Sequence, residues 1–273
     1  MMKIISHYNT TKKMYLLDNK YYMIRNGDFA TNANTKIIYG FVSGILCIDD
    51  YVNRNSTDCI MILVTSTTVW SVVELYLHIS KTREIKPMYI MLGNYKQQLP
   101  QSLGIILQAF QEGGFISTLG LYFGDRLYEM KSQIHMHIFI MFVVMNIFMK
   151  KNKIKSSKRQ VNTRTSLVLI GSASMYNMYM CYNHPEHIER QLSMFCAMVY
   201  ICSYWTFFAW YRGFRSIEIH EPKKIGQCDQ SDGPIQTYGV RPANYWETFC
   251  VMAYDVIFEI GMAYTFFYNI TLV

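Results

Sequence analysis

Four acidic residues interrupt long apolar stretches of this sequence: Glu74, Glu112, Asp255 and Glu259. A charged carboxylate at the centre of a lipid bilayer costs on the order of 3 kcal/mol, so it is usually hidden, paired, protonated or functional. The central parts of these stretches contain no Lys or Arg, and we therefore expect no direct ion pair at that depth. The chemistry that remains is binding of a proton or a cation, or hydrogen bonding to neighbouring polar groups.

The spacing of these residues predicts polar stripes on three helices. Asp255 and Glu259 are four residues apart and share a helix face, as do Gln108 and Glu112. Glu74 follows Thr67 and Ser71 at helical spacing. Stripes that meet around a wet interior would form a proton or cation path through Glu74, Gln108, Glu112, Asp255 and Glu259. The same stripes would equally hold the helices together without transport.

Two pairs of glycines accompany these acids. Gly113 and Gly114 directly follow Glu112, where they would let the helix loosen or let a neighbouring helix approach. Gly120 and Gly124 form a small-residue pattern that is typical of close helix packing in membranes. We expect packing from both pairs and treat a functional break at Gly113 as the alternative.

Other polar groups gather near the expected outer surface. Four histidines, His135, His137, His184 and His187, are candidate metal ligands or pH sensors, and the alternative is that they are partly solvated side chains at the interface. Asp125 and Arg126 are expected to form a local interfacial ion pair or a helix cap. Asn55 and Asn269 begin glycosylation sequons.

The elements that would position these groups are apolar helices. The chain has 273 residues, of which 51% are hydrophobic and 16% charged, whereas soluble proteins carry about 25% charged residues. A spanning helix needs about 20 mainly apolar residues. Seven segments approach this requirement: 37–52, 57–80, 99–123, 133–149, 165–183, 191–211 and 244–270. The sequence therefore predicts an all-α, polytopic membrane bundle of seven transmembrane helices.

The basic residues predict its orientation. If all seven segments cross, 22 of the 26 Lys and Arg fall on one side, in residues 1–36, 81–98, 150–164 and 212–243. Cytoplasmic loops carry such an excess. We therefore expect a cytosolic N-terminal tail (1–36), a transmembrane helical domain (37–273) with a long cytosolic loop at 212–243, and a C-terminus outside or in a lumen.

This organisation limits the partners and the location. The net charge of +7 is distributed over short tracts between apolar segments, so it indicates orientation in a membrane and not binding of nucleic acid. We expect membrane lipids as partners, a cytosolic partner at the basic loop 150–164 or at loop 212–243, and residence in the plasma membrane or an endomembrane. No pattern in the sequence calls for a cofactor.

Three functions are consistent with these observations. The first is a proton or cation channel or transporter that uses the intramembrane carboxylates. The second is a non-enzymatic receptor, adaptor or scaffold in which the stripes hold helices together. The third, an intramembrane lipid-modifying enzyme, would need a metal or an activated nucleophile among the outer histidines.

The expected topology resembles that of heliorhodopsins and of the progestin and adiponectin receptor group, which have seven helices and a cytosolic N-terminus. A retinal Schiff base needs a lysine in the seventh helix, and residues 244–270 contain none. The resemblance therefore implies a shared topology and carries no retinal chemistry to this chain. The histidine and aspartate zinc pattern of the receptor group is not evident either.

Overall fold

The computed structural model describes residues 19–28, 30–92, 95–127, 131–148, 154–222 and 238–273. These residues are mostly helical, and every segment predicted to span is a helix. Five of the helices are continuous: α2 (Ala33–Arg54), α3 (Asp58–Ile79), α6 (Lys131–Phe148), α7 (Arg164–Asn183) and α8 (Ile188–Tyr211). A single 3₁₀ turn, η2 (Pro185–His187), joins α7 to α8.

The other two helices change character in their middles. The third predicted segment consists of α4 (Gln101–Ala109), a π-helical segment η1 (Phe110–Phe115) and α5 (Ile116–Gly124). The seventh consists of α9 (Tyr245–Tyr254), a π-helical segment η3 (Asp255–Met262) and α10 (Ala263–Leu272). Single turns of π-helix inside α-helices occur frequently at functional sites. Both π-helical segments here contain acidic residues that the sequence singles out.

The prediction of an all-α fold is wrong, because a five-stranded antiparallel sheet is present. Its strands follow the order β2-β5-β1-β6-β7. They are β1 (Lys20–Asn26), β2 (Arg83–Ile85), β5 (Lys155–Gln160), β6 (Arg215–Pro222) and β7 (Tyr238–Pro242). A separate hairpin pairs β3 (Tyr89–Leu92) with β4 (Tyr95–Gln98).

Short alternating patterns explain why these segments form strands. In β6, Arg215, Ile217 and Ile219 are buried, whereas the residues between them are partly exposed. This period of two is the pattern of a strand with one covered face. The strands come from the four segments expected on the basic side of the membrane, so loops far apart in the sequence join in one sheet. Local sequence patterns do not show that pairing, because β1 pairs with strands about 130 to 200 residues further along the chain.

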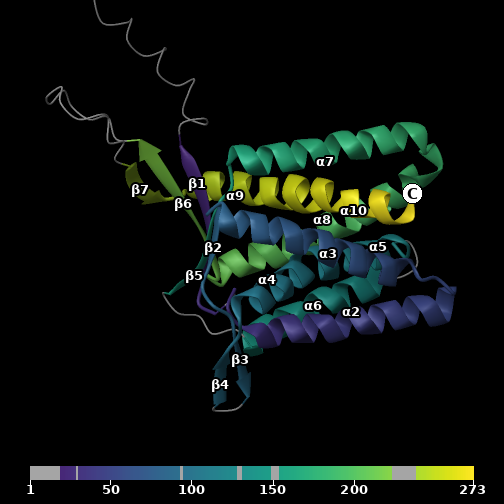
Figure 1. The fold of residues 1–273 in the computed structure, drawn as a ribbon, viewed down its shortest axis with the longest axis horizontal. Helices are drawn as coiled ribbons and strands as arrows, with labels where there is room; N and C mark the ends of the chain where they lie inside the picture. The colour runs from purple at the N-terminus through teal and green to yellow at the C-terminus, as the bar shows by residue number, and fades with distance from the viewer. Residues whose placement is uncertain (1–18, 29, 93–94, 128–130, 149–153, 223–237) are drawn as a thin grey trace, which may run out of the picture.

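The sheet lies at one end of the helical bundle, with the helices extending from it in roughly one direction (Figure 1). The N-terminal ends of α2 and α9 and the C-terminal ends of α3 and α8 lie near this end. The strands therefore present side chains to the interior of the bundle from its end. This placement allows residues outside the apolar segments to reach acids within them.

Among the described residues, three helices are long and apolar enough to cross a membrane by length and composition: Asp58–Ile79, Pro185–Tyr211 and Tyr245–Leu272. The count of seven spans is not supported on these criteria. The predicted first segment, for example, becomes a 22-residue helix, but it contains Lys36, Asp49, Asp50 and Arg54. Association with a membrane thus has support from three helices.

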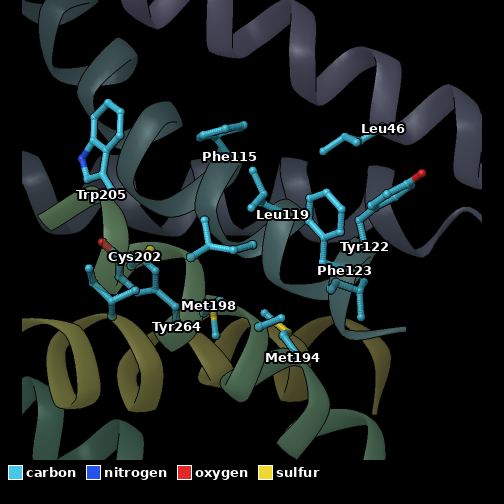
Figure 2. Packing of buried hydrophobic residues seen from close by; sticks show 14 of the residues in the cluster. Leu46, Phe115, Leu119, Tyr122, Phe123, Met194, Met198, Cys202, Trp205 and Tyr264 are labelled. Atoms are coloured by element: carbon cyan, nitrogen blue, oxygen red, sulfur yellow. The ribbon is translucent and has the colours of Figure 1, made fainter. Parts of the chain in front are cut away.

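The main hydrophobic core lies between α2, α5, α8 and the C-terminal helix. Phe115, Leu119 and Phe123 face Met194 and Met198 in this layer, and Leu46 and Trp205 lie at its margin (Figure 2). Glycines allow the close contacts. A Cβ atom on Gly124 would lie 2.7 Å from the backbone nitrogen of Met194, and one on Gly120 would lie 2.2 Å from Cγ of Met198.

The glycines beside Glu112 have the same purpose. A Cβ atom on Gly113 would lie 2.6 Å from Cβ of Trp70, and one on Gly114 would lie 2.2 Å from Oγ1 of Thr67. Both contacts are with α3. The structure therefore shows close approach of a neighbouring helix at Gly113 and Gly114, within a segment whose backbone is also widened to the π-helical form.

Candidate functional site

Four arginines occupy one face of the sheet. Arg25 of β1 pairs in register with Arg215 of β6, and Arg83 of β2 pairs with Arg159 of β5. Met23 of β1 is opposite Arg159, so Arg25, two residues further on, points to the same face. Like charges directly opposite each other destabilise a sheet. The arginine-bearing face of the sheet is therefore stable only if negative charge from the bundle offsets the repulsion. The helices provide this charge as four carboxylates.

The first two carboxylates form one chain of ion pairs with two of the arginines, which we call the first ionic chain: Glu74–Arg83–Glu112–Arg25. Nη1 of Arg83 donates to Oε1 of Glu74 and, at 2.5 Å, to Oε2 of Glu112. Nη2 of Arg25 donates to the other oxygen of Glu112, which also accepts from Nε2 of Gln108 at 2.5 Å. Glu112 thus binds two arginines and a glutamine.

The other two carboxylates form the second ionic chain: Glu259–Arg159–Asp255–Arg215. Nη2 of Arg159 donates to Glu259 and, at 2.7 Å, to Oδ1 of Asp255. Nη1 of Arg215 lies 3.0 Å from Oδ2 of Asp255. The two chains have the same plan, since each has a carboxylate with one arginine at its end and a carboxylate shared by two arginines at its centre.

These pairs overturn the expectation that the intramembrane acids have no basic partner. The apolar segments do lack central Lys and Arg, but the arginines come from strands within the stretches that were expected to form the polar tail and loops. Glu74, Gln108, Glu112, Asp255 and Glu259 are all brought together at the sheet end of the bundle. The residues that were missed are the four arginines, and the alternation around Arg215 was the available signal.

The ionic chains are buried. Glu74 is 2% exposed, Arg83 3% and Asp255 5%. Between the chains lies a cavity of about 50 Å³, lined by Glu112, Asp255 and Glu259 among others. Such a volume has room for a few water molecules, which need polar partners of the kind present here. The site is thus a polar pocket enclosed by the sheet and the helices.

Burial and charge act against each other on the strand residues of this site. Burial alone lowers the pKa of Arg159, but the carboxylates of Glu259 and Asp255 outweigh it and hold that pKa above the usual arginine value. For Arg25, burial and the neighbouring guanidinium groups outweigh Glu112 and lower the pKa. Positive charge is therefore well compensated at Arg159 and less so at Arg25.

Lys36 adds a fifth basic group at the edge of the site. It lies in the first turns of α2, is 1% exposed, and its Nζ is 2.8 Å from Oε1 of Gln111. Burial and, to a lesser extent, the positive charge of Arg25 lower the pKa of Lys36 to about 7, against the opposing effect of nearby carboxylates. A lysine with such a pKa exchanges a proton near neutral pH.

Helix caps help to fix the elements that carry these groups. Asn32 caps α2, its side chain accepting from the backbone N–H of Asn34 at 3.0 Å. Asn244 and Glu247 form a capping box at the start of α9, in which each satisfies a backbone N–H of the other. The caps define where α2 and α9 begin, and thereby the depth at which Lys36 and Asp255 lie.

A second ionic cluster, which we call the distal cluster, joins the ends of the helices remote from the sheet. Asp125 accepts from Arg190 and Arg54, each at 2.7 Å, and Arg190 also binds Asp58 at 2.7 Å. Arg126 lies 2.8 Å from Asp50. Burial acts to raise the pKa of Asp125, but Arg190 and Arg54 outweigh it and hold that pKa below its usual value.

The distal cluster corrects the expectation of a local pair between Asp125 and Arg126. Each binds residues of other helices, because neighbouring side chains at a helix end point in different directions. Arg126 also lies over the ring of Tyr122, with its Cζ 3.8 Å from the ring centroid. The cluster therefore ties the ends of α2, α3, α5 and α8 together.

The candidate metal ligands are not brought together. Nε2 of His135 is 2.8 Å from the hydroxyl of Tyr200, and Nδ1 of His187 is 2.8 Å from that of Tyr268. His137 is buried against Phe115 and Phe123. His184 is 3.5 Å from Glu186. Within the described ranges, no three His, Cys, Asp or Glu side chains form a metal-binding group.

The two sequons differ in their surroundings. Asn55 is exposed at the end of α2. Asn269 is 2% exposed, and its amide donates to Asn177 at 2.8 Å and to Gln191 at 3.2 Å. A glycan needs an exposed acceptor, so we no longer expect glycosylation at Asn269.

The expected partner sites at 150–164 and 212–243 lie partly outside the described residues, and their remaining residues belong mainly to β5, β6 and β7.

Comparisons with known proteins add no assignment: no family model matches the chain, and no similar curated protein or solved structure is found.

Proposed function

We propose that this chain is a multi-pass membrane transporter that takes up and releases protons at the two ionic chains. The observation that carries the proposal is the gathering of three carboxylates, Glu112, Asp255 and Glu259, around a small polar cavity inside an apolar bundle, with Glu74 joined to them through Arg83. Ionisable residues inside membrane segments usually mark ion or proton paths. The substrate that would move with the protons is left open.

The surface of the bundle supports a position within lipid. Large apolar side chains are exposed along helices that fall short of the strict length and composition criteria, including Phe41 (71%) and Ile45 (65%) on α2 and Phe139 (65%) on α6. Met175 (73%) on α7 continues the surface. Contiguous exposed apolar patches mark membrane or protein contacts. We propose that all seven helical regions cross the bilayer, with the sheet at the cytosolic face.

Protons fit the site better than metal cations do. Four guanidinium groups border the cavity or its acids, and their charges repel a bound cation. A proton instead neutralises a carboxylate and releases its arginine. Breaking a buried ion pair without protonation costs about 3–5 kcal/mol, because a charge is left without a partner. Protonation of Glu112 or Glu259 neutralises the carboxylate, and the arginine that it releases keeps its charge. That unpaired charge favours opening of the sheet end, where the guanidinium group would reach water.

Proton flux into vesicles tests the proposal. The full chain is reconstituted into liposomes that contain a pH-sensitive dye, and an imposed pH gradient drives the flux under a clamped potential. We expect Glu112→Gln and Glu259→Gln to reduce the flux to the level of empty vesicles. The control is Glu186→Gln, whose side chain is 62% exposed. Flux by both variants equal to that of the wild type would rule out these acids as the proton site.

A non-transporting receptor or scaffold is the second candidate. The equal number of arginines and carboxylates in the ionic chains favours it, since a balanced network is what a permanent joint between sheet and bundle requires. This function predicts no proton flux from the wild-type protein in the same vesicles, even though the Gln variants unfold more easily.

A further inference from the structure

A large groove lies on the side of the bundle between α3, α7 and the C-terminal half of the last helix. Its volume is about 470 Å³, within the range of roughly 300–1,000 Å³ that is usual for small-molecule sites. Most of its lining is apolar, with Val73, Leu169, Ile170 and Phe266 as examples. A few polar groups, chiefly Arg159 and Glu259, occur among them.

The polar part of the groove contains hydrogen-bond donors that have no acceptor among the described residues. Both bonds of Arg159 to carboxylates leave from Nη2, and its Nε and Nη1 donate to none of the described residues. The indole N–H of Trp70 is buried and finds no acceptor among them. Trp70 and Arg159 line the groove together. The lack of a partner is costly for the buried Trp70 donor, whereas the Arg159 side chain is 14% exposed and keeps further donors. A ligand with oxygen acceptors would satisfy both.

The charge of the site selects among such ligands. Glu259 and Asp255 already accept from Arg159, and the ionic chains contain equal numbers of positive and negative groups. A ligand with a carboxylate or phosphate would add an unbalanced charge in an apolar setting, which is expensive. An uncharged head group supplies acceptors without this penalty, and the apolar lining suits an acyl chain.

We propose that the groove binds an uncharged single-chain amphiphile of the monoacylglycerol type. The acyl chain lies against α3, α7 and α10, and oxygens of the head group accept from the indole N–H of Trp70 and from the guanidinium of Arg159. This assignment goes beyond proton movement and does not depend on it, because binding is measured without a gradient.

Photolabelling of the purified full chain in nanodiscs tests this assignment. The probe is a monoacylglycerol with a diazirine in its acyl chain, and labelled peptides are identified by mass spectrometry. We expect labelling to concentrate on α3, α7 and α10. Unlabelled monoacylglycerol should compete, whereas an alkane of equal length should not. Stronger competition by the corresponding fatty acid than by the monoacylglycerol would overturn the uncharged head group.

Two variants separate the groove from the general lipid surface. Ala173 lines the groove, and Ala173→Phe should fill it and abolish the competed labelling. Val168→Phe, on the exposed face of the same helix, is the matched control and should leave labelling unchanged. Trp70→Phe should weaken competition roughly five- to tenfold, as expected for the loss of one hydrogen bond. Equal labelling of the wild type and the Ala173 variant would refute the site.

Discussion

Among the four carboxylates of the two ionic chains, the central ones have more charged partners than the terminal ones. Glu112 and Asp255 each bind two arginines, whereas Glu74 and Glu259 each bind one. A shared carboxylate resists protonation because two cations favour its charged form. The terminal carboxylate gives up its single partner more readily. We therefore expect Glu259 and Glu74 to accept protons first, with Glu112 and Asp255 following as their arginines are released.

Lys36 offers a pH test at the residue scale. Its pKa is lowered from 10.5 to about 7 in the folded protein, so between these values the unfolded chain binds more protons than the folded one. Stability then rises with pH. In detergent, the thermal unfolding midpoint should increase from pH 7 to pH 10. The stabilisation from neutral Lys36 is complete above pH 10.5 and is lost as the pH falls through 7.

The comparison for that experiment is Lys36→Met, which keeps the length of the side chain and removes its titration. The difference in midpoint between the variant and the wild type should be largest near pH 7 and should shrink towards pH 10. A difference that stays constant over this range would show that Lys36 does not change its protonation on folding.

At the scale of elements, glycines set how closely helices approach. The backbone of Met194 lies so near Gly124 that an added Cβ atom would collide with it at 2.7 Å, and a backbone atom has little freedom to move. Gly171 of α7 has no neighbour within 4 Å of such an atom. The two positions therefore provide a matched pair, both helical, that differ in their surroundings.

We predict that Gly124→Ala lowers the free energy of unfolding by about 1–3 kcal/mol, the usual cost of overpacking. Gly171→Ala should instead raise it by up to about 1 kcal/mol, because alanine favours the helix. Denaturant unfolding in a fixed detergent measures both. Similar changes for the two variants would mean that α5 and α8 do not pack as closely as described.

Some of these elements could be predicted from the sequence and others could not. The helices follow from apolar length alone, since the predicted segment 57–80 became α3 (Asp58–Ile79). The strands could not be found in the same way, because Arg25 and Arg215 become neighbours only when two distant loops pair. The acids were visible as anomalies within apolar stretches, but the four arginines that bind them were not. The sequence therefore predicted the acidic half of the site and missed the basic half.

The whole molecule has two charged ends separated by an apolar layer. Lys36 and Asp50 lie at opposite ends of α2, about 21 Å apart along the helix axis. Leu119, which lies between Glu112 and Asp125 in the sequence, packs with Met198 in the apolar layer (Figure 2). Ion pairs close both ends in this structure. A transporter with such a plan would open one end at a time. We propose that protonation of the ionic chains opens the sheet end.

The measurement that tests this account most directly compares proton flux and stability in one charge-balanced variant. Arg25→Gln combined with Glu112→Gln removes the ion pairs of Glu112 with Arg25 and Arg83 and leaves Arg83 paired with Glu74. Because no buried charge loses its partner, the thermal midpoint should stay close to that of the wild type. We predict that this variant, reconstituted in vesicles, loses its proton flux. A variant that keeps both the wild-type midpoint and the wild-type flux would contradict the central claim that the ionic chain through Glu112 is part of the proton path.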